Sequence, residues 1–299
     1  MDSHSEAPPP GSGIAHILLP RLHDLGDGFV VARMIPHAAA RTVGPFVFLD
    51  QFGPVDLPPG RAMDVRPHPH IGLATVTYLY DGEIMHRDSL GSVQAIRPGE
   101  VNWMTAGRGI VHSERTPAEL RDTTRRMAGL QFWVGLPTAR EEMEPAFAHH
   151  GADELPLLDA EGATIRLVVG ALMGKRSPVV TQSETLLADI VLSGKARLAI
   201  PASHAERAIQ VTGGQVEIAG ARFGTQRLLV LEPGRAVTIL AIEDSRVVLF
   251  GGDPLDGARH LAWNFVSSSK ERLEQAKDDW RSGRFAKVPG ETEFIPLPA

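Results

Sequence analysis

The chain reads Arg66-Pro67-His68-Pro69-His70-Ile71-Gly72 in one segment and Gly109-Ile110-Val111-His112-Ser113-Glu114 in a later one. In an extended strand, side chains at positions i and i+2 leave the same face, so each segment presents two donor side chains toward one point. Three imidazoles and one carboxylate, from His68, His70, His112 and Glu114, therefore predict a transition-metal site.

The four donor side chains limit which metals could bind, but they do not identify one. Neutral imidazoles with one carboxylate suit Fe(II), Mn(II), Ni(II), Cu(II) or Zn(II), whereas Mg²⁺ and Ca²⁺ call for mostly oxygen donors. Four protein ligands on an octahedral metal leave two open positions, which implies oxygenase-like or Lewis-acid chemistry. A tetrahedral Zn²⁺ would instead be saturated and purely structural, and the residues alone leave both possibilities open. We expect Phe46, Phe48, Trp103 and Met104 to supply apolar lining for an aromatic ligand.

Composition excludes several other classes of function. The chain has 299 residues, 43% of them apolar and 22% charged, with a formal net charge of -6, so it offers no basic surface for direct nucleic-acid binding. It has no cysteine, which excludes disulfides, thiolate ligands and a cysteine nucleophile. Residues 1–13 lack the pattern of a signal peptide, and no apolar run is long enough for a membrane span, so we expect a cytoplasmic protein.

The rest of the chain reads as short strands separated by turns. Its 30 Gly and 23 Pro punctuate runs rich in β-type residues, which predicts a sandwich or barrel. The expected strands span residues 29–35, 75–80, 93–96, 130–134, 165–169, 188–192, 208–211, 227–231, 237–241 and 247–250. Residues 270–281 depart from this pattern and predict an amphipathic helix, with Ser267, Ser268 and Ser269 as candidate caps.

The two halves of the chain also echo each other. Residues 79–84 have the pattern of a strand, a Gly turn and a second strand, and Pro98-Gly99 follows them. The same order recurs at residues 211–216, which precede Pro233-Gly234. This pattern indicates a duplicated β-domain. We expect a flexible N-terminal tail over residues 1–13, a metal-binding domain over 14–145 and a second domain over 146–299 that ends in the helix.

The residues around the two histidine pairs resemble those of a known family. The blocks around the histidine pairs resemble the pirin family of the cupin superfamily, and they read Phe46-Val47-Phe48-Leu49-Asp50, Arg66-Pro67-His68-Pro69-His70-Ile71-Gly72 and Asn102-Trp103-Met104-Thr105-Ala106-Gly107-Arg108-Gly109-Ile110-Val111-His112-Ser113-Glu114. The resemblance implies an all-β bicupin: two antiparallel, jelly-roll-like β-barrels with a C-terminal α-helix. It implies that the N-terminal barrel holds the metal, usually iron, on His68, His70, His112 and Glu114.

This chain departs from the family pattern at two places. Ala74 stands where many relatives carry Glu, which should alter the surroundings of the site rather than remove it. In the second barrel, Ile200 and Ala202 occupy the positions that correspond to the first histidine pair, and residues 231–252 contain no histidine. Only the N-terminal barrel is therefore expected to bind metal.

The resemblance implies one fold but several possible functions. Some similar proteins are quercetin 2,3-dioxygenases, which open the flavonol heterocycle with dioxygen and release carbon monoxide, so we expect a flavonol-like aromatic substrate and dioxygen as partners. We expect Glu114 to serve both as ligand and as general base. Other members are described as transcriptional co-regulators or modulators of metabolic enzymes, which implies a non-catalytic, metal-dependent regulator that binds a partner protein. A metal enzyme with a substrate other than a flavonoid is a third possibility.

Overall fold

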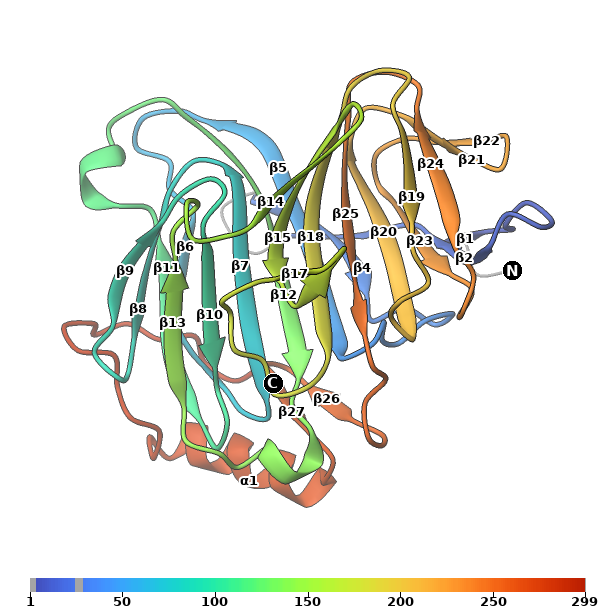
Figure 1. Cartoon of the computed structure of the whole chain (residues 1–299). Coiled ribbons are helices and arrows are strands. Elements are labelled where there is room, and N and C mark those ends of the chain that lie inside the picture. Colours follow the sequence, from blue (N-terminus) through green and yellow to red (C-terminus); the bar gives the residue numbers. More distant parts are fainter. Residues whose placement is uncertain (1–3, 25–28, 299) are drawn as a thin grey trace. The chain divides into compact units, whose positions relative to one another are not determined.

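The computed structural model describes residues 4–24 and 29–298 of the chain. The chain folds into two compact units. The first unit contains Met1–His23, Ala32–Asp50 and Asp153–Pro254, and the second contains Asp24–Val31, Gln51–Ala152 and Leu255–Ala299. The expectation of an all-β bicupin with one C-terminal α-helix is confirmed, although the sheets do not close into complete barrels (Figure 1).

The first unit is built from one large and one small antiparallel sheet. The large sheet has the order β1 (Ser5–Glu6), β2 (Ile14–Leu18), β23 (Arg227–Leu231), β20 (Glu206–Gly213), β25 (Ser245–Gly252), β18 (Thr185–Leu192), β15 (Ala163–Val169) and β14 (Leu157–Ala160). The small sheet has the order β19 (Arg197–Ile200), β24 (Val237–Ala241), β21 (Val216–Ile218) and β22 (Ala221–Phe223). A separate hairpin pairs β16 (Ala171–Leu172) with β17 (Lys175–Arg176).

The second unit repeats this plan. A four-stranded sheet has the order β6 (Asp64–His70), β11 (Ile110–Arg115), β8 (Ile84–Asp88) and β9 (Val93–Ile96). A larger sheet has the order β13 (Ala146–His150), β10 (Val101–Thr105), β7 (Leu73–Asp81), β12 (Arg125–Gly135), β5 (Phe46–Leu57), β4 (Val30–Ile35) and β3 (Arg21–Asp24). The boundary between the units crosses β3, β4 and β5. The remaining elements are the hairpin β26 (His260–Ala262) and β27 (Phe265–Ser267), two short 3₁₀ helices η1 (Ala118–Leu120) and η2 (Thr138–Arg140), and α1 (Lys270–Arg281).

The interiors of the two units differ in chemical character. In the first unit, aliphatic side chains from both sheets form one large cluster, and Ile200, which corresponds to a histidine of the first pair, is part of it. In the second unit, buried polar residues that include His68, His70, His86, Asp88, His112 and Glu114 accompany the apolar ones.

The helix forms as the sequence predicts. It spans Lys270–Arg281, and the Ser269 hydroxyl accepts a hydrogen bond from the Arg272 backbone N–H. This cap satisfies one of the amides that a helix N-terminus leaves without a partner. Leu273 and Ala276 are the buried positions of the helix, and they pack with Ile71 in one cluster.

The grouping of the chain differs from the contiguous domains expected over residues 14–145 and 146–299. β2 pairs with β23, so an N-terminal strand completes the large sheet of the first unit. The C-terminal helix belongs to the second unit because it packs on Ile71, immediately after the first histidine pair. Within the expected tail, residues 1–3 lie outside the described residues, and Ser5–Glu6 form β1, which pairs with β2.

Candidate metal centre

Two neighbouring antiparallel strands bring the three histidines together. His112 on β11 lies directly opposite His68 on β6, and His70 lies opposite Ile110. One ring nitrogen from each of the three histidines lies within 4.8 Å of the other two, and all three residues are buried. Among the described residues, this is the one group of three or more His, Cys, Asp or Glu side chains whose donor atoms could hold a metal ion.

The spacing of two donor atoms fits their binding to one metal ion. The Nε2 atoms of His70 and His112 lie 3.1 Å apart. Two nitrogens bound to one metal at about 2.1 Å each lie about 3.0 Å apart at a right angle and about 3.4 Å apart at the tetrahedral angle. The observed separation therefore lies in the range that two nitrogens bound to one metal ion adopt.

Backbone carbonyls determine which nitrogen of two ligands is free. The Nδ1–H of His68 donates to the Arg66 carbonyl at 2.8 Å, and the Nδ1–H of His70 donates to the Asn264 carbonyl at 3.0 Å. A carbonyl oxygen can only accept, so Nδ1 carries the proton in both rings. In each neutral imidazole the Nε2 lone pair is then left for a metal.

The site also keeps its imidazoles neutral. Burial lowers the pKa of His68 to about 4, against the favourable effect of the Arg66 carbonyl on the charged form. Burial, and next the charge that neighbouring imidazoles would carry, lower the pKa values of His70 and His112 well below the ordinary value. At neutral pH no proton therefore competes with a metal for these rings.

Glu114 is buried near the histidines but is held by a different partner. A bulge interrupts the pairing of β11 with β6 between His112 and Glu114. Thr77 on β7 donates its hydroxyl to the Glu114 carboxylate at 2.8 Å, and no oxygen of this carboxylate belongs to the group of donor atoms within 4.8 Å. Burial raises the pKa of Glu114, while the hydrogen bond from Thr77 opposes that effect. The role of Glu114 as fourth ligand stays a prediction.

Sequence reasoning gave no role to His86, which the structure places beside the ligands. The Nδ1 atom of His86 lies 3.4 Å from Nδ1 of His112, and its Nε2 lies 3.0 Å from Oδ2 of Asp88. Ile84, His86 and Asp88 alternate as the buried positions of β8. The signal that could have found them is a His-x-Asp pair in a strand, the same i and i+2 spacing that identified the ligands.

The aromatic surroundings differ in part from those expected. Trp133 contacts His70 edge to face with ring centroids 5.1 Å apart. Trp103 and Met104 are buried on β10 in the second unit, as is the rest of that strand. Phe46 and Phe48 belong instead to the first unit, where the former packs against Phe250 and the latter lies beneath Arg33.

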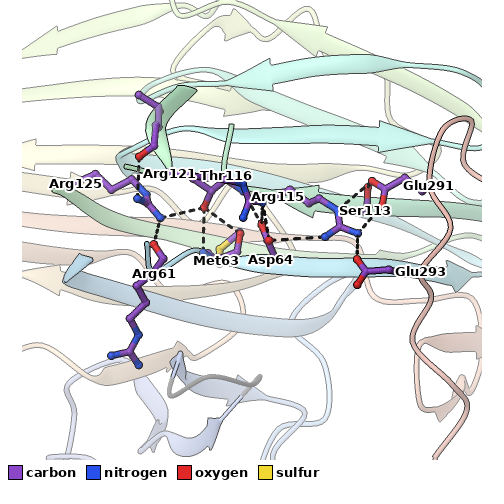
Figure 2. Close-up of polar contacts among 11 residues, drawn as sticks. Arg61, Met63, Asp64, Ser113, Arg115, Thr116, Arg121, Arg125, Glu291 and Glu293 are labelled. Carbon is purple, nitrogen blue, oxygen red and sulfur yellow. Dashed lines mark hydrogen bonds and ion pairs between the residues drawn. The ribbon is translucent and has the colours of Figure 1, made fainter. Parts of the chain in front are cut away.

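A segment that follows the helix covers the outer face of the metal-bearing strands. Ser113 and Arg115 alternate with the inward-facing residues of β11, and both donate to the carboxylate of Glu291 (Figure 2). Glu293 is a second carboxylate that accepts from Arg115, and the backbone N–H of Ile295 donates to the Pro67 carbonyl at 2.8 Å. This segment, residues 291–295, therefore ties β6 to β11 from outside.

One β-sandwich unit holds a buried group of three histidines between its sheets, and the other unit has the same plan of strands. These features define a bicupin. The comparisons agree: the chain matches the Pirin family over residues 28–134 and the Pirin C-terminal cupin domain over residues 187–286. The chain belongs to the pirin family.

Individual relatives match over nearly the full length. The chain is 49% identical to a pirin-like protein of Caulobacter vibrioides over 93% of this chain and 97% of that protein. It is 38% identical to a protein of Pseudomonas aeruginosa named as a candidate quercetin 2,3-dioxygenase, over 90% of this chain and 84% of that protein. The crystal structure of a quercetin 2,3-dioxygenase from Acinetobacter baumannii matches with a TM-score of 0.89 at 34% identity, covering 95% of this chain and 94% of that one.

The described part of the chain contains no helix with the length and apolar character that a membrane crossing requires.

Proposed function

We propose that this protein is a mononuclear metal-dependent dioxygenase that opens the heterocycle of flavonols such as quercetin by 2,3-dioxygenation. The observation that carries the proposal is the convergence of three buried, neutral imidazoles, two of which have their Nε2 atoms 3.1 Å apart. The names of relatives from Pseudomonas aeruginosa and Acinetobacter baumannii support the substrate class.

His68, His70 and His112 would hold the metal, which we propose to be Fe(II). The same donors accept Mn, Ni, Cu or Zn, so availability as well as affinity selects among them. A bound redox metal would supply a Lewis acid for the substrate oxygens and a site at which dioxygen and the flavonol meet.

Glu114 is the proposed general base. A flavonol must lose the proton of its 3-hydroxyl group before it is electron-rich enough to react with dioxygen, and a carboxylate beside the ligands can accept that proton. Burial raises the pKa of Glu114, which makes its carboxylate a stronger base than one in water. The Thr77 hydroxyl donates to the carboxylate at 2.8 Å and would hold it in place to accept the proton.

Two substitutions separate the proposed base from the proposed ligands. We expect Glu114→Gln to retain metal and lose turnover of quercetin, because the amide keeps the shape of the side chain but cannot take the proton. We expect His112→Ala to lower the metal content itself, measured by elemental analysis of the purified protein. Equal turnover in the wild type and Glu114→Gln would refute the role of Glu114 as base.

A fully metal-loaded wild type that neither bleaches quercetin nor releases carbon monoxide would contradict the dioxygenase. That result would favour the alternative of a metal-dependent regulator, or an enzyme with another substrate.

A further inference from the structure

A buried chain of side chains lies behind one of the three histidine ligands. It runs from Asp88 through His86 to His112, and these residues are 0%, 2% and 1% exposed. The pairing of β8 with β11 puts Asp88 directly opposite His112 and His86 opposite Glu114. The Phe147 ring stacks on His86 at 4.4 Å with an interplanar angle of 14°, so the plane of that imidazole is fixed as well.

Asp88 is anchored as an acceptor. Its Oδ1 accepts the backbone N–H groups of Leu90 and Ser92 at 2.9 and 3.0 Å, which leaves Oδ2 for His86. Burial alone would raise the pKa of Asp88, but the hydrogen bonds from His86 and Ser92 outweigh it and lower that pKa. An ionised carboxylate only accepts, so the proton between Asp88 and His86 belongs to Nε2 of His86.

The third ligand differs from the other two in what fixes its tautomer. His68 and His70 each donate from Nδ1 to a backbone carbonyl, which can never become a donor. When His112 offers Nε2 to a metal, its proton must reside on Nδ1 and requires an acceptor there. The atom in reach is Nδ1 of His86, 3.4 Å away, and it accepts only while the proton of His86 is on Nε2.

We propose that Asp88 and His86 are positioning residues for the metal centre: the carboxylate fixes the tautomer of His86, and His86 in turn holds His112 with a free Nε2. This inference rests on the proposed metal centre but not on the proposed substrate. Outer partners of this kind orient the ligand ring and increase its basicity, and their loss typically weakens metal binding by about 10- to 100-fold.

The decisive variant is Asp88→Asn. The amide oxygen of the new side chain is expected to keep the two backbone N–H bonds that Oδ1 receives, which turns the NH₂ group toward His86. His86 must then accept at Nε2 and carry its proton on Nδ1, where it opposes the Nδ1 proton of His112. We expect Zn(II) affinity, measured by competition with a chelator, to fall about 10- to 100-fold while the circular dichroism spectrum is unchanged.

The matched control is Asp189→Asn. Asp189 is also a buried aspartate, but it pairs with Arg246 in the first unit, whereas the histidine ligands belong to the second. We expect this variant to bind Zn(II) like the wild type. An equal loss of affinity in both variants would overturn the proposal, because it would show a general effect of removing a buried charge.

A second pair of variants covers the case in which Asp88→Asn does not fold. His86→Gln keeps one acceptor and one donor on a planar amide, whereas His86→Leu keeps neither. We expect His86→Gln to retain most of the Zn(II) affinity of the wild type and His86→Leu to lose it. Equal affinities for the two would contradict a role through hydrogen bonding.

Nitrogen-15 NMR of the imidazoles tests the tautomer in the unaltered protein. In the Zn(II)-loaded wild type we expect His112 to be protonated at Nδ1 and bound at Nε2, and His86 to be protonated at Nε2 alone. The opposite tautomer of either ring overturns the proposal. These readouts use Zn(II) without oxygen or flavonol, so a wild type that shows the expected tautomers but no quercetin turnover contradicts only the proposed function.

Discussion

Acidification from pH 7 to pH 5 should change the metal affinity of this site far less than that of an ordinary cluster of histidines. An imidazole with the usual pKa of about 6.5 is protonated to about 97% at pH 5, which costs about 25-fold in affinity for each ligand relative to pH 7. Three such ligands together would lose about 15,000-fold. In this protein the pKa of His68 is lowered to about 4, and those of His70 and His112 are lowered well below the ordinary value.

The lowered pKa values set how much metal affinity the folded protein should lose on acidification. A ring with a pKa of about 4 is only about 10% protonated at pH 5, so the imidazoles together should cost less than about twofold in affinity. Glu114 acts differently, because its raised pKa lets a proton compete for the carboxylate as the pH falls. The Glu114→Gln variant removes that contribution and isolates the imidazoles.

The assay is calorimetric titration of the metal-free protein with Zn(II) at several pH values between 5 and 7, in the wild type and in Glu114→Gln. We expect a nearly flat affinity for the variant. A loss of hundredfold or more in Glu114→Gln would show that the histidines titrate as exposed side chains do. The reasoning from burial would then be refuted.

Three further outcomes follow from the structure. The pKa of His68 is about 4 in the folded protein, below its unfolded value, so the unfolded state binds more protons between pH 6.5 and 4. The free energy of unfolding of the metal-free protein should therefore fall by about 3 kcal/mol through this residue as the pH drops across that range. Urea unfolding at several pH values measures this change. Gly72→Ala should destabilise the protein by more than the cost of about 1–2 kcal/mol that a positive φ imposes on an L residue, because a Cβ there would lie 2.0 Å from the Val266 carbonyl oxygen. Gly60→Ala is the control, since Gly60 also has a positive φ but has open space around it. Equal losses of thermal stability in the two variants would contradict the packing argument. Glu291→Gln should weaken the ties to Ser113 and Arg115 and increase amide hydrogen exchange in β11, and unchanged exchange would show that the outer segment does not hold that strand.

Local patterns predicted much of the structure. The i and i+2 spacing of the histidine pairs placed His68, His70 and His112 on one interior face, because side chains alternate across a strand whatever its surroundings. The helix over Lys270–Arg281 and a serine cap among residues 267–269 were also predicted, since both depend on neighbouring residues in the chain.

Features that depend on distant pairing could not be predicted in this way. The pairing of β2 with β23 joins the N-terminal segment to a strand more than 200 residues further along the chain, and no local spacing encodes it. The carbonyl of Asn264 that fixes His70 comes from the C-terminal part of the chain, and it was missed for the same reason. His86 was missed because its significance lies in the neighbouring strand, where His112 needs an acceptor.

Anaerobic loading with Fe(II), followed by addition of quercetin and air, tests the proposed enzyme most directly. The metal content is measured first, then the bleaching of the long-wavelength band of quercetin and the carbon monoxide released. We predict one iron per chain and one carbon monoxide for each quercetin consumed, with turnover lost in Glu114→Gln. A protein that carries one iron per chain on its histidines but leaves quercetin intact would contradict the dioxygenase.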